Sequence, residues 1–160
     1  LDVFSQKYKP RVLKFTEAFS AINDSIGICK FSTLEAFALG PEDIAEGMSA
    51  YFGEEYTMED LLQIGERIVN LERMYNVRHG MDRRDDMLHE RFLKEPLDVY
   101  VEKDGALTEE KFKEGLVVEL DSMLDGYYDL RGWSRKGIPT AEKLEGLGLG
   151  ELAKDIPAEG

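Results

Sequence analysis

The spacing of apolar residues constrains the fold of this chain more than any other feature of its sequence. Between Thr57 and Gly80, apolar side chains recur at steps of three and four residues, the period of one face of an α-helix. The residues that set this period are Leu61, Ile64, Ile68, Leu71 and Tyr75. Thr57 and Asp60 have the spacing of a capping box, and Gly80 ends the run. Gly65 lies within the apolar stripe, which predicts a close crossing with another helix.

Most of the remaining chain shows the same period. Helices are predicted over residues 12–22, from Gly40-Pro41 to Gly53, over 116–133, and in a short stretch after Pro139-Thr140. Val99-Tyr100-Val101 has extended character but is too short to indicate a sheet. The glycines at 146, 148 and 150 and the tail after them predict a fraying end. We therefore expect an all-α protein, a single irregular helical domain over residues 1–160 with little or no strand.

The amino-acid composition disfavours several classes of binding partner and of protein. The formal net charge is −13, which disfavours binding to nucleic acid or to an anionic membrane surface. Hydrophobic residues make up 42% of the chain and aromatic residues 10%, too many for a disordered acidic tail. No apolar run approaches the roughly 18 residues of a membrane-spanning helix, and no signal peptide opens the chain. We expect a cytoplasmic globular protein and, because the sequence begins at Leu1, a processed chain or a piece of a longer one.

Cys29 is the single cysteine, which excludes an intramolecular disulfide and a self-contained thiolate metal cage. Two interpretations of the surrounding segment remain open. In the first, Asp24 and Gly27 end a helix and Cys29 is a small buried thiol. In the second, the Asp24 carboxylate accepts hydrogen bonds, Gly27 lets the backbone approach a ligand, and Lys30 favours a Cys29 thiolate that binds iron. One thiolate cannot hold a cluster, so the second interpretation requires ligands from outside the chain.

The other residue types that could carry chemistry fit structural roles. His79 and His89 lack a nearby cysteine or third histidine, so their spacing does not indicate a zinc site. Asp85 and Asp86 are predicted to form solvated ion pairs with the arginines near them, Arg83, Arg84 and Arg91. Three aromatic residues follow helical spacing and are predicted to lie in the core: Tyr127, Tyr128 and Trp133.

Four stretches stand out for their order as well as their residues. They are Asp24-Ser-Ile-Gly-Ile-Cys-Lys30, Ile64-Gly-Glu-Arg-Ile-Val-Asn-Leu-Glu-Arg-Met-Tyr-Asn-Val-Arg78 with Gly80, Arg83-Arg-Asp-Asp86 with Glu90-Arg-Phe92, and Leu120-Asp121 through Tyr127-Tyr-Asp-Leu-Arg-Gly-Trp133 to Gly137-Ile-Pro-Thr140. In this order they resemble the tungsten-dependent aldehyde ferredoxin oxidoreductases, in which the first stretch reads Asp-x-x-Gly-Leu-Cys-x. The resemblance spans roughly residues 10–150. Ile28 replaces the family's usual Leu, and His89 stands where Pro is usual.

The resemblance implies that this chain is the C-terminal helical part of such an enzyme. Asp24 would hydrogen-bond one pterin of a tungsten (or molybdenum) bis-pterin cofactor, while Gly27, the Ile28 backbone and Lys30 complete the cofactor-binding segment. Cys29 would be the fourth ligand of a 4Fe–4S cluster. The N-terminal domain that cradles the cofactor and the domain that bears a Cys-x-x-Cys-x-x-x-Cys motif are absent from this chain. No catalytic residue is assigned, because the family's acid–base residues lie upstream of the sequence.

By the same resemblance, the full-length enzyme would oxidise aldehydes to carboxylic acids and pass electrons to ferredoxin in an anaerobe. The 160-residue chain alone is expected to be inactive and free of cofactor. Its surface around residues 24–31 is expected to be exposed, which would favour homo-oligomers. The residues also leave an alternative from another class, a standalone acidic helical protein-interaction domain in which Cys29 is buried and redox-silent.

Overall fold

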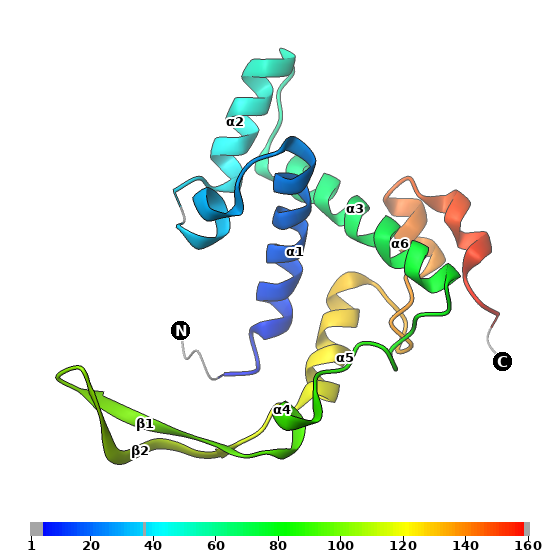
Figure 1. Ribbon diagram of the computed structural model, residues 1–160. Helices are drawn as coiled ribbons and strands as arrows, with labels where there is room; N and C mark the ends of the chain where they lie inside the picture. Colours follow the sequence, from blue (N-terminus) through cyan, green and yellow to red (C-terminus); the bar gives the residue numbers. More distant parts are fainter. Residues whose placement is uncertain (1–4, 37, 159–160) are drawn as a thin grey trace.

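The computed structural model describes residues 5–36 and 38–158 and is built mainly from helices (Figure 1). In chain order the elements are α1 (Lys9–Ile26), the π-helical turn η1 (Phe31–Glu35), α2 (Pro41–Phe52), α3 (Met58–Arg78), α4 (Glu90–Lys94), β1 (Leu97–Lys103), β2 (Ala106–Leu116), α5 (Leu120–Arg131), α6 (Ala141–Gly146) and the 3-10 turn η2 (Gly150–Asp155). The long helix α3 runs through the middle of the molecule, with α1 and α2 towards one end and α6 towards the other (Figure 1).

Local sequence signals account for the ends of the main helices. Thr57 Oγ1 accepts a hydrogen bond from the Asp60 N–H, and the Asp60 carboxylate accepts one from the Thr57 N–H, so the predicted capping box of α3 is confirmed. The helix α2 begins at Pro41, and the N–H of Gly40 donates to Asp43 Oδ2 at 2.7 Å. Gly53 follows α2 in the left-handed conformation that ends a helix.

The helices α1 and α3 cross at Gly65, as the sequence predicted. A Cβ atom built on Gly65 would lie 2.2 Å from the carbonyl oxygen of Ala18, well inside contact distance. Only a glycine lets the two backbones approach this closely. The crossing fixes the direction of α1 relative to α3, and therefore the position of the segment that follows α1.

The expectation of an all-α protein with little or no strand is wrong. β1 and β2 pair antiparallel as a two-stranded sheet that projects from the helical body (Figure 1). Asp104 and Gly105 join the strands with φ angles of 53° and 79°, the left-handed values of the tight turn that suits a hairpin. The predicted helix over 116–133 is correspondingly shorter, because Leu116 still belongs to β2 and α5 begins at Leu120.

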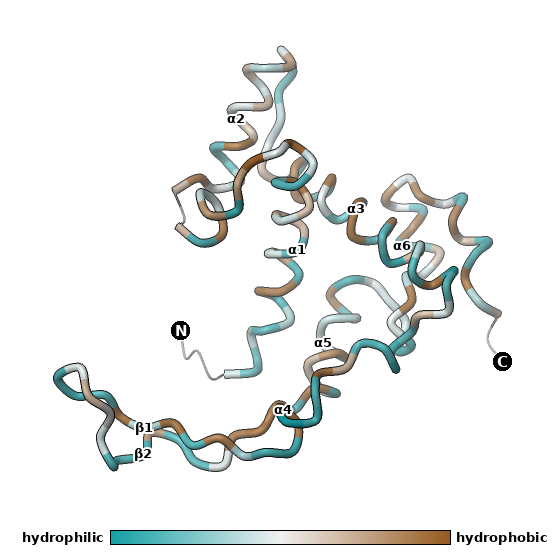
Figure 2. Tube along the Cα trace, viewed as in Figure 1, coloured by the Kyte–Doolittle hydropathy of each residue, from teal (hydrophilic) through white to brown (hydrophobic). Residues whose placement is uncertain are grey.

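The hairpin escaped prediction because extended character is evident over only three residues, Val99–Val101, too few to indicate a sheet. Apolar residues alternate along β1 at Leu97, Val99 and Val101, but no residue of β1 or β2 whose side chain is described is buried, so this alternation does not mark a core face. Hydrophilic residues occupy the tip of the hairpin, and hydrophobic ones recur along its length (Figure 2). The Asp104-Gly105 pair was the signal available in the sequence.

Three small clusters form the core, and α3 takes part in each. The first joins α1, α2 and the start of α3 through Phe19, Ile22, Ile44, Ala45 and Leu61. The second joins the end of α3 to the C-terminal part of the chain through Met74, Val77, Ile138 and Leu144. The third consists of Tyr127, Tyr128 and Trp133, with Val69 of α3 packed against it, which confirms the predicted aromatic core.

Up to residue 158, the C-terminal stretch is not the fraying end that its glycines suggested; the last two residues of the predicted tail lie outside the described residues. Leu149, Leu152 and Ile156 pack against the second cluster, and residues between them form the turn η2. Within residues 5–36 and 38–158, no helix has both the length and the apolar character of a membrane-spanning segment.

Candidate functional site

The segment after α1 carries the residues that the sequence singled out. Gly27 ends α1 with φ +76°, and its N–H donates to the carbonyl of Asn23, as does the N–H of Ile28 at 2.9 Å. These bonds form a left-handed helix terminus, the role predicted for Gly27. They turn the chain sharply away from the helix axis, so that Cys29 follows directly after the turn.

The segment is held against the first core cluster on both sides of Cys29. Ile28 and Leu34 pack against that cluster. The backbone N–H of Ser32 donates to the Cys29 carbonyl at 3.1 Å, and Ser32 Oγ donates to the same oxygen at 2.7 Å. The backbone of Cys29 is therefore tied into a compact turn.

The thiol of Cys29 is free, and the residue is exposed. The interpretation of Cys29 as a buried core thiol is therefore wrong. Its neighbour Phe31 exposes 76% of its surface, a large apolar area for a single residue. The expectation that this surface is open in the isolated chain is confirmed.

Asp24 and Lys30 come together across the turn. Lys30 Nζ lies 2.9 Å from Asp24 Oδ2, and both side chains are largely exposed. The ammonium thus contacts the carboxylate at the end of α1. The structure brings all five predicted cofactor-binding residues into one surface segment, Asp24, Gly27, Ile28, Cys29 and Lys30.

This segment has the chemistry of a partial binding site. Among the described residues, no three His, Cys, Asp or Glu side chains are grouped so that they could hold a metal ion. An exposed thiol on a fixed backbone can supply one ligand to an iron–sulfur cluster whose other ligands come from elsewhere. An exposed carboxylate beside it can accept hydrogen bonds from ring N–H groups. The donor set fits a cofactor that is shared with another part of a protein.

The two histidines have structural contacts away from this segment. His89 caps α4, with its Nδ1 accepting a hydrogen bond from the Arg91 N–H at 3.2 Å. His79 ends α3, and its ring lies 4.7 Å from that of Tyr75.

The prediction of a solvated ion-pair network around Asp85 and Asp86 is wrong for Asp86. Arg73 of α3, which is only 8% exposed, donates to both oxygens of Asp86 at 2.8 and 2.6 Å. The hydroxyl of Tyr128 donates to the same carboxylate. Burial and the Asp86 carboxylate raise the pKa of Tyr128, so the phenol remains the proton donor. The three arginines named in the prediction pair elsewhere, Arg83 with Asp121 and Asp125, Arg84 with Asp82, and Arg91 with Glu95.

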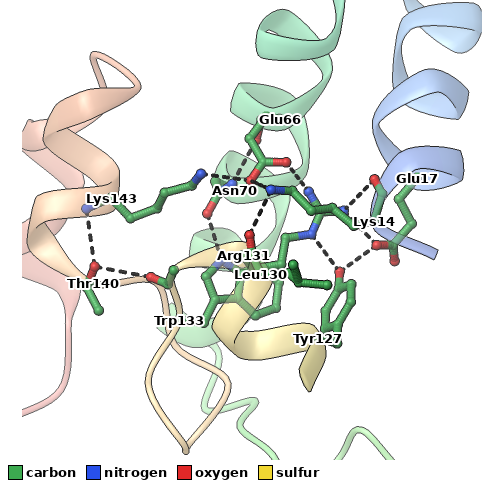
Figure 3. Close-up of polar contacts among 11 residues, drawn as sticks. Lys14, Glu17, Glu66, Asn70, Tyr127, Leu130, Arg131, Trp133, Thr140 and Lys143 are labelled. Atoms are coloured by element: carbon green, nitrogen blue, oxygen red, sulfur yellow. Dashed lines mark hydrogen bonds and ion pairs between the residues drawn. The ribbon is translucent and has the colours of Figure 1, made fainter. Parts of the chain in front are cut away.

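A second buried polar network has no counterpart in the sequence analysis (Figure 3). Arg131 is fully buried and donates to Glu66, to Glu17 at 2.7 Å and to the Tyr127 hydroxyl at 3.0 Å. Lys143 Nζ lies 2.9 Å from the other oxygen of Glu66. We call these five residues the Arg131 network. Its members come from α1, α3, α5 and α6, so it links the four helices electrostatically.

The Arg131 network is paired internally, which suits a structural role. Burial of the phenol and the neighbouring Glu17 carboxylate raise the pKa of Tyr127. The phenol therefore stays protonated, and its hydroxyl donates a hydrogen bond to Glu17. No sequence signal identified Arg131, because charged residues on helices usually face solvent.

An apolar groove of about 400 Å³ lies at the base of the hairpin. Phe92, Pro96, Leu97, Val118 and Met123 are among its lining residues. It shares no residue with the segment around Cys29. Its charged lining residues are Lys9, Arg91 and Glu95, and the last two pair with each other, so the groove mainly offers an apolar contact surface.

The sequence matches known proteins along most of its length. The family model described as aldehyde ferredoxin oxidoreductase, domains 2 and 3, matches residues 1–149. A tungsten-containing aldehyde ferredoxin oxidoreductase from Pyrococcus furiosus is 41% identical over 152 residues, which cover 94% of this chain and 22% of that protein. A protein of the same description from Thermococcus kodakarensis is 38% identical over the same shares. The chain thus spans about a fifth of the length of these relatives.

One more distant relative and one solved structure add to this comparison. The WOR-like subunit of an aliphatic sulfonate oxidoreductase from Pyrococcus furiosus is 34% identical over 146 residues, which cover 88% of this chain and 21% of that protein. The solved active-site complex BamBC of benzoyl coenzyme A reductase, bound to 1,5-dienoyl-CoA, matches with a TM-score of 0.71 and 23% identity. The match covers 100% of this chain and 23% of the solved one, and at this identity it supports the fold alone.

Proposed function

The chain belongs to the aldehyde ferredoxin oxidoreductase family, and from this premise we propose that it is the C-terminal part of a cytoplasmic enzyme that oxidises aldehydes to carboxylic acids. Because the chain covers about a fifth of its relatives, the activity belongs to the longer protein. The part played by this chain is to contribute one pterin contact and one cluster ligand.

The exposed thiol of Cys29 carries this proposal. It lies on a turn whose backbone is fixed by Asn23 and Ser32, and beside the Asp24 carboxylate. A thiolate that is open to solvent but fixed in position suits a ligand that completes a cluster held mainly by another domain. A core cysteine would be buried instead.

When bound, a tungsten (or molybdenum) bis-pterin would supply the two-electron oxidation of the aldehyde, and a 4Fe–4S cluster would supply one-electron transfer to ferredoxin. Cys29 Sγ would ligate the cluster. Asp24 accepts from Lys30 at Oδ2, and its Oδ1 would accept from a pterin N–H. The Ile28 N–H already donates to Asn23, so Ile28 would contact the cofactor through its carbonyl oxygen.

The relatives support a role for this chain that does not depend on the substrate. Their names specify aldehyde in one case and aliphatic sulfonate in another, yet each aligns with more than four-fifths of this chain. The higher identity belongs to the tungsten-containing aldehyde enzymes, which favours an aldehyde as the substrate class.

The test is substitution of Cys29 in the full-length protein. We expect Cys29→Ala to remove the visible absorbance of the cluster and aldehyde-dependent reduction of viologen, because the cluster loses a ligand. Asp24→Ala should lower pterin occupancy. Glu35→Gln, at an exposed position on the same segment, is the control and should leave both unchanged. A Cys29→Ala protein with full cluster content and activity would contradict the proposal.

The isolated chain provides a second test. We expect it to bind neither cofactor and to self-associate through exposed apolar residues such as Phe31. Turnover of aldehyde by the purified 160-residue chain would contradict the assignment of the active site to the longer protein.

A further inference from the structure

Two fully buried polar side chains, Asn23 and Thr33, lie on either side of the segment that carries Cys29. Asn23 is 0% exposed and Thr33 is 1% exposed. Asn23 Nδ2 donates to Thr33 Oγ1 at 2.9 Å, and Thr33 Oγ1 donates to the Lys30 carbonyl at 3.3 Å. The Asn23–Thr33 hydrogen bond therefore joins the end of α1 to η1 across the base of the turn.

The backbone of Asn23 holds the near side of the same turn. Its carbonyl accepts from the N–H groups of Gly27 and Ile28, while its side chain holds Thr33. The four residues from Cys29 to Ser32 thus lie between two points that are both anchored on Asn23. The backbone carbonyl and the side chain of Asn23 together set the width of the turn.

This arrangement has a cost that apolar packing would not have. Asn23 Oδ1 is buried and finds no hydrogen-bond partner within the described residues. A buried acceptor without a partner is destabilising, and an apolar pair of the same shape would avoid the loss. Ile28 and Leu34, which flank the turn, already pack against the first core cluster. The polar pair therefore contributes defined geometry, because a hydrogen bond fixes direction where apolar contacts do not.

We propose that the Asn23–Thr33 hydrogen bond positions Cys29 Sγ for ligation of the cluster. The inference rests on the proposed function, since it takes Cys29 as the ligand. Asn23 and Thr33 are positioning residues that act through the backbone of the turn. Outer contacts of this kind tune the affinity and the electronic properties of a metal site through the orientation of its ligand.

The experiment uses the full-length protein with its cluster. Thr33→Val removes the hydroxyl and keeps the shape, whereas Thr33→Ser keeps the hydroxyl. The double variant Asn23→Leu with Thr33→Val replaces both partners by apolar groups, which restores stability without restoring the hydrogen bond. Ser49→Ala is the matched control, because Ser49 Oγ also ties a loop by accepting from the Tyr56 N–H at 2.8 Å, outside the Cys29 segment.

We expect Thr33→Val and the double variant to change the EPR spectrum of the reduced cluster and to release iron to a chelator roughly tenfold faster. Thr33→Ser should match the parent protein. Ser49→Ala should lower the melting temperature and leave the cluster unchanged. If Thr33→Val fails to fold, the cluster of the double variant is compared with that of the parent protein instead.

Two outcomes would overturn the inference. In the first, the cluster properties follow the melting temperature across the variants, so that the double variant recovers both. In the second, Thr33→Val and the double variant keep the parent spectrum and the parent rate of iron release. Failure of the proposed function would give a different result, a Cys29→Ala protein that retains its cluster. Amide hydrogen exchange over residues 28–32 tests the turn itself, and it should be faster in Thr33→Val than in Thr33→Ser.

Discussion

Substitution of Gly65 by alanine tests the crossing that places the Cys29 segment. The new Cβ would lie 2.2 Å from the Ala18 carbonyl oxygen, whereas ordinary contact begins near 3.4 Å. The helices would have to separate by roughly 1 Å, because a backbone carbonyl cannot rotate away as a side chain can. Packing lost over such a gap is substantial, since a gap of about 0.5–1 Å forfeits a quarter to a half of each contact's attraction.

Two opposing effects set the change in unfolding free energy of Gly65→Ala. Overpacking costs about 1–3 kcal/mol, and the rigid obstacle at Ala18 places Gly65→Ala at the upper end. Replacing glycine within a helix returns about 1 kcal/mol through helix propensity. The net loss in unfolding free energy is therefore about 2 kcal/mol. At about 2–4 °C per kcal/mol for a chain of this size, the melting temperature should fall by about 4–8 °C.

Thermal unfolding followed by circular dichroism measures this difference, with Gly47→Ala as the matched control. Gly47 lies inside α2, is exposed, and has nothing within 4 Å of a built Cβ. That variant should gain about 0.5–1 kcal/mol. A Gly65→Ala protein that melts at or above the parent temperature, as Gly47→Ala should, would refute the close crossing of α1 and α3.

Three further predictions concern the rest of the fold. Arg131→Met removes one partner of the buried Glu66 carboxylate and one of Glu17, while Lys143 still contacts Glu66, and it should lower the unfolding free energy in urea by about 3 kcal/mol; Arg84→Met at an exposed ion pair should cost far less, and equal losses would contradict the network's role. The pKa values of Tyr127 and Tyr128 are raised in the folded chain, so stability should fall as the pH rises above about 10, where the unfolded phenols ionise; ultraviolet titration should show two late phenols that ionise early once urea is added, and seven equivalent phenols would exclude this. Gly105→Ala strains the hairpin turn at φ 79° and should speed amide exchange in β1 and β2 without changing the global melting temperature, while a lower global value would mean that the hairpin supports the body.

The helices and the site segment were predictable because each has a local signature. The period of three and four from Leu61 to Tyr75 follows from the need to bury one helix face, and Gly27 marks a helix end by its conformational freedom. The resemblance of the Asp24–Lys30 stretch to a known family located the candidate site. Those signals are contained in a few neighbouring residues.

The features that were missed depend on contacts between distant residues or on the absence of burial. Nothing near Arg131 indicates that Glu66, 65 positions away, will be its partner in the interior. The same holds for Asp86, whose arginine lies on a helix 13 residues earlier. The hairpin was missed because the three extended residues Val99–Val101 are too few to indicate a sheet, and the strands have no buried face that would strengthen the signal.

The division of the core into three clusters along α3 has a consequence for cooperativity. Leu61 belongs to the first cluster, Met74 and Val77 belong to the second, and Val69 packs against the third. Each cluster can lose its packing while the others keep α3 helical, so local opening need not become global unfolding. The part of the molecule that holds the first cluster can then open while the second and third clusters remain packed. A chain of this design would exchange its amide protons in separate steps, with α3 the last to open.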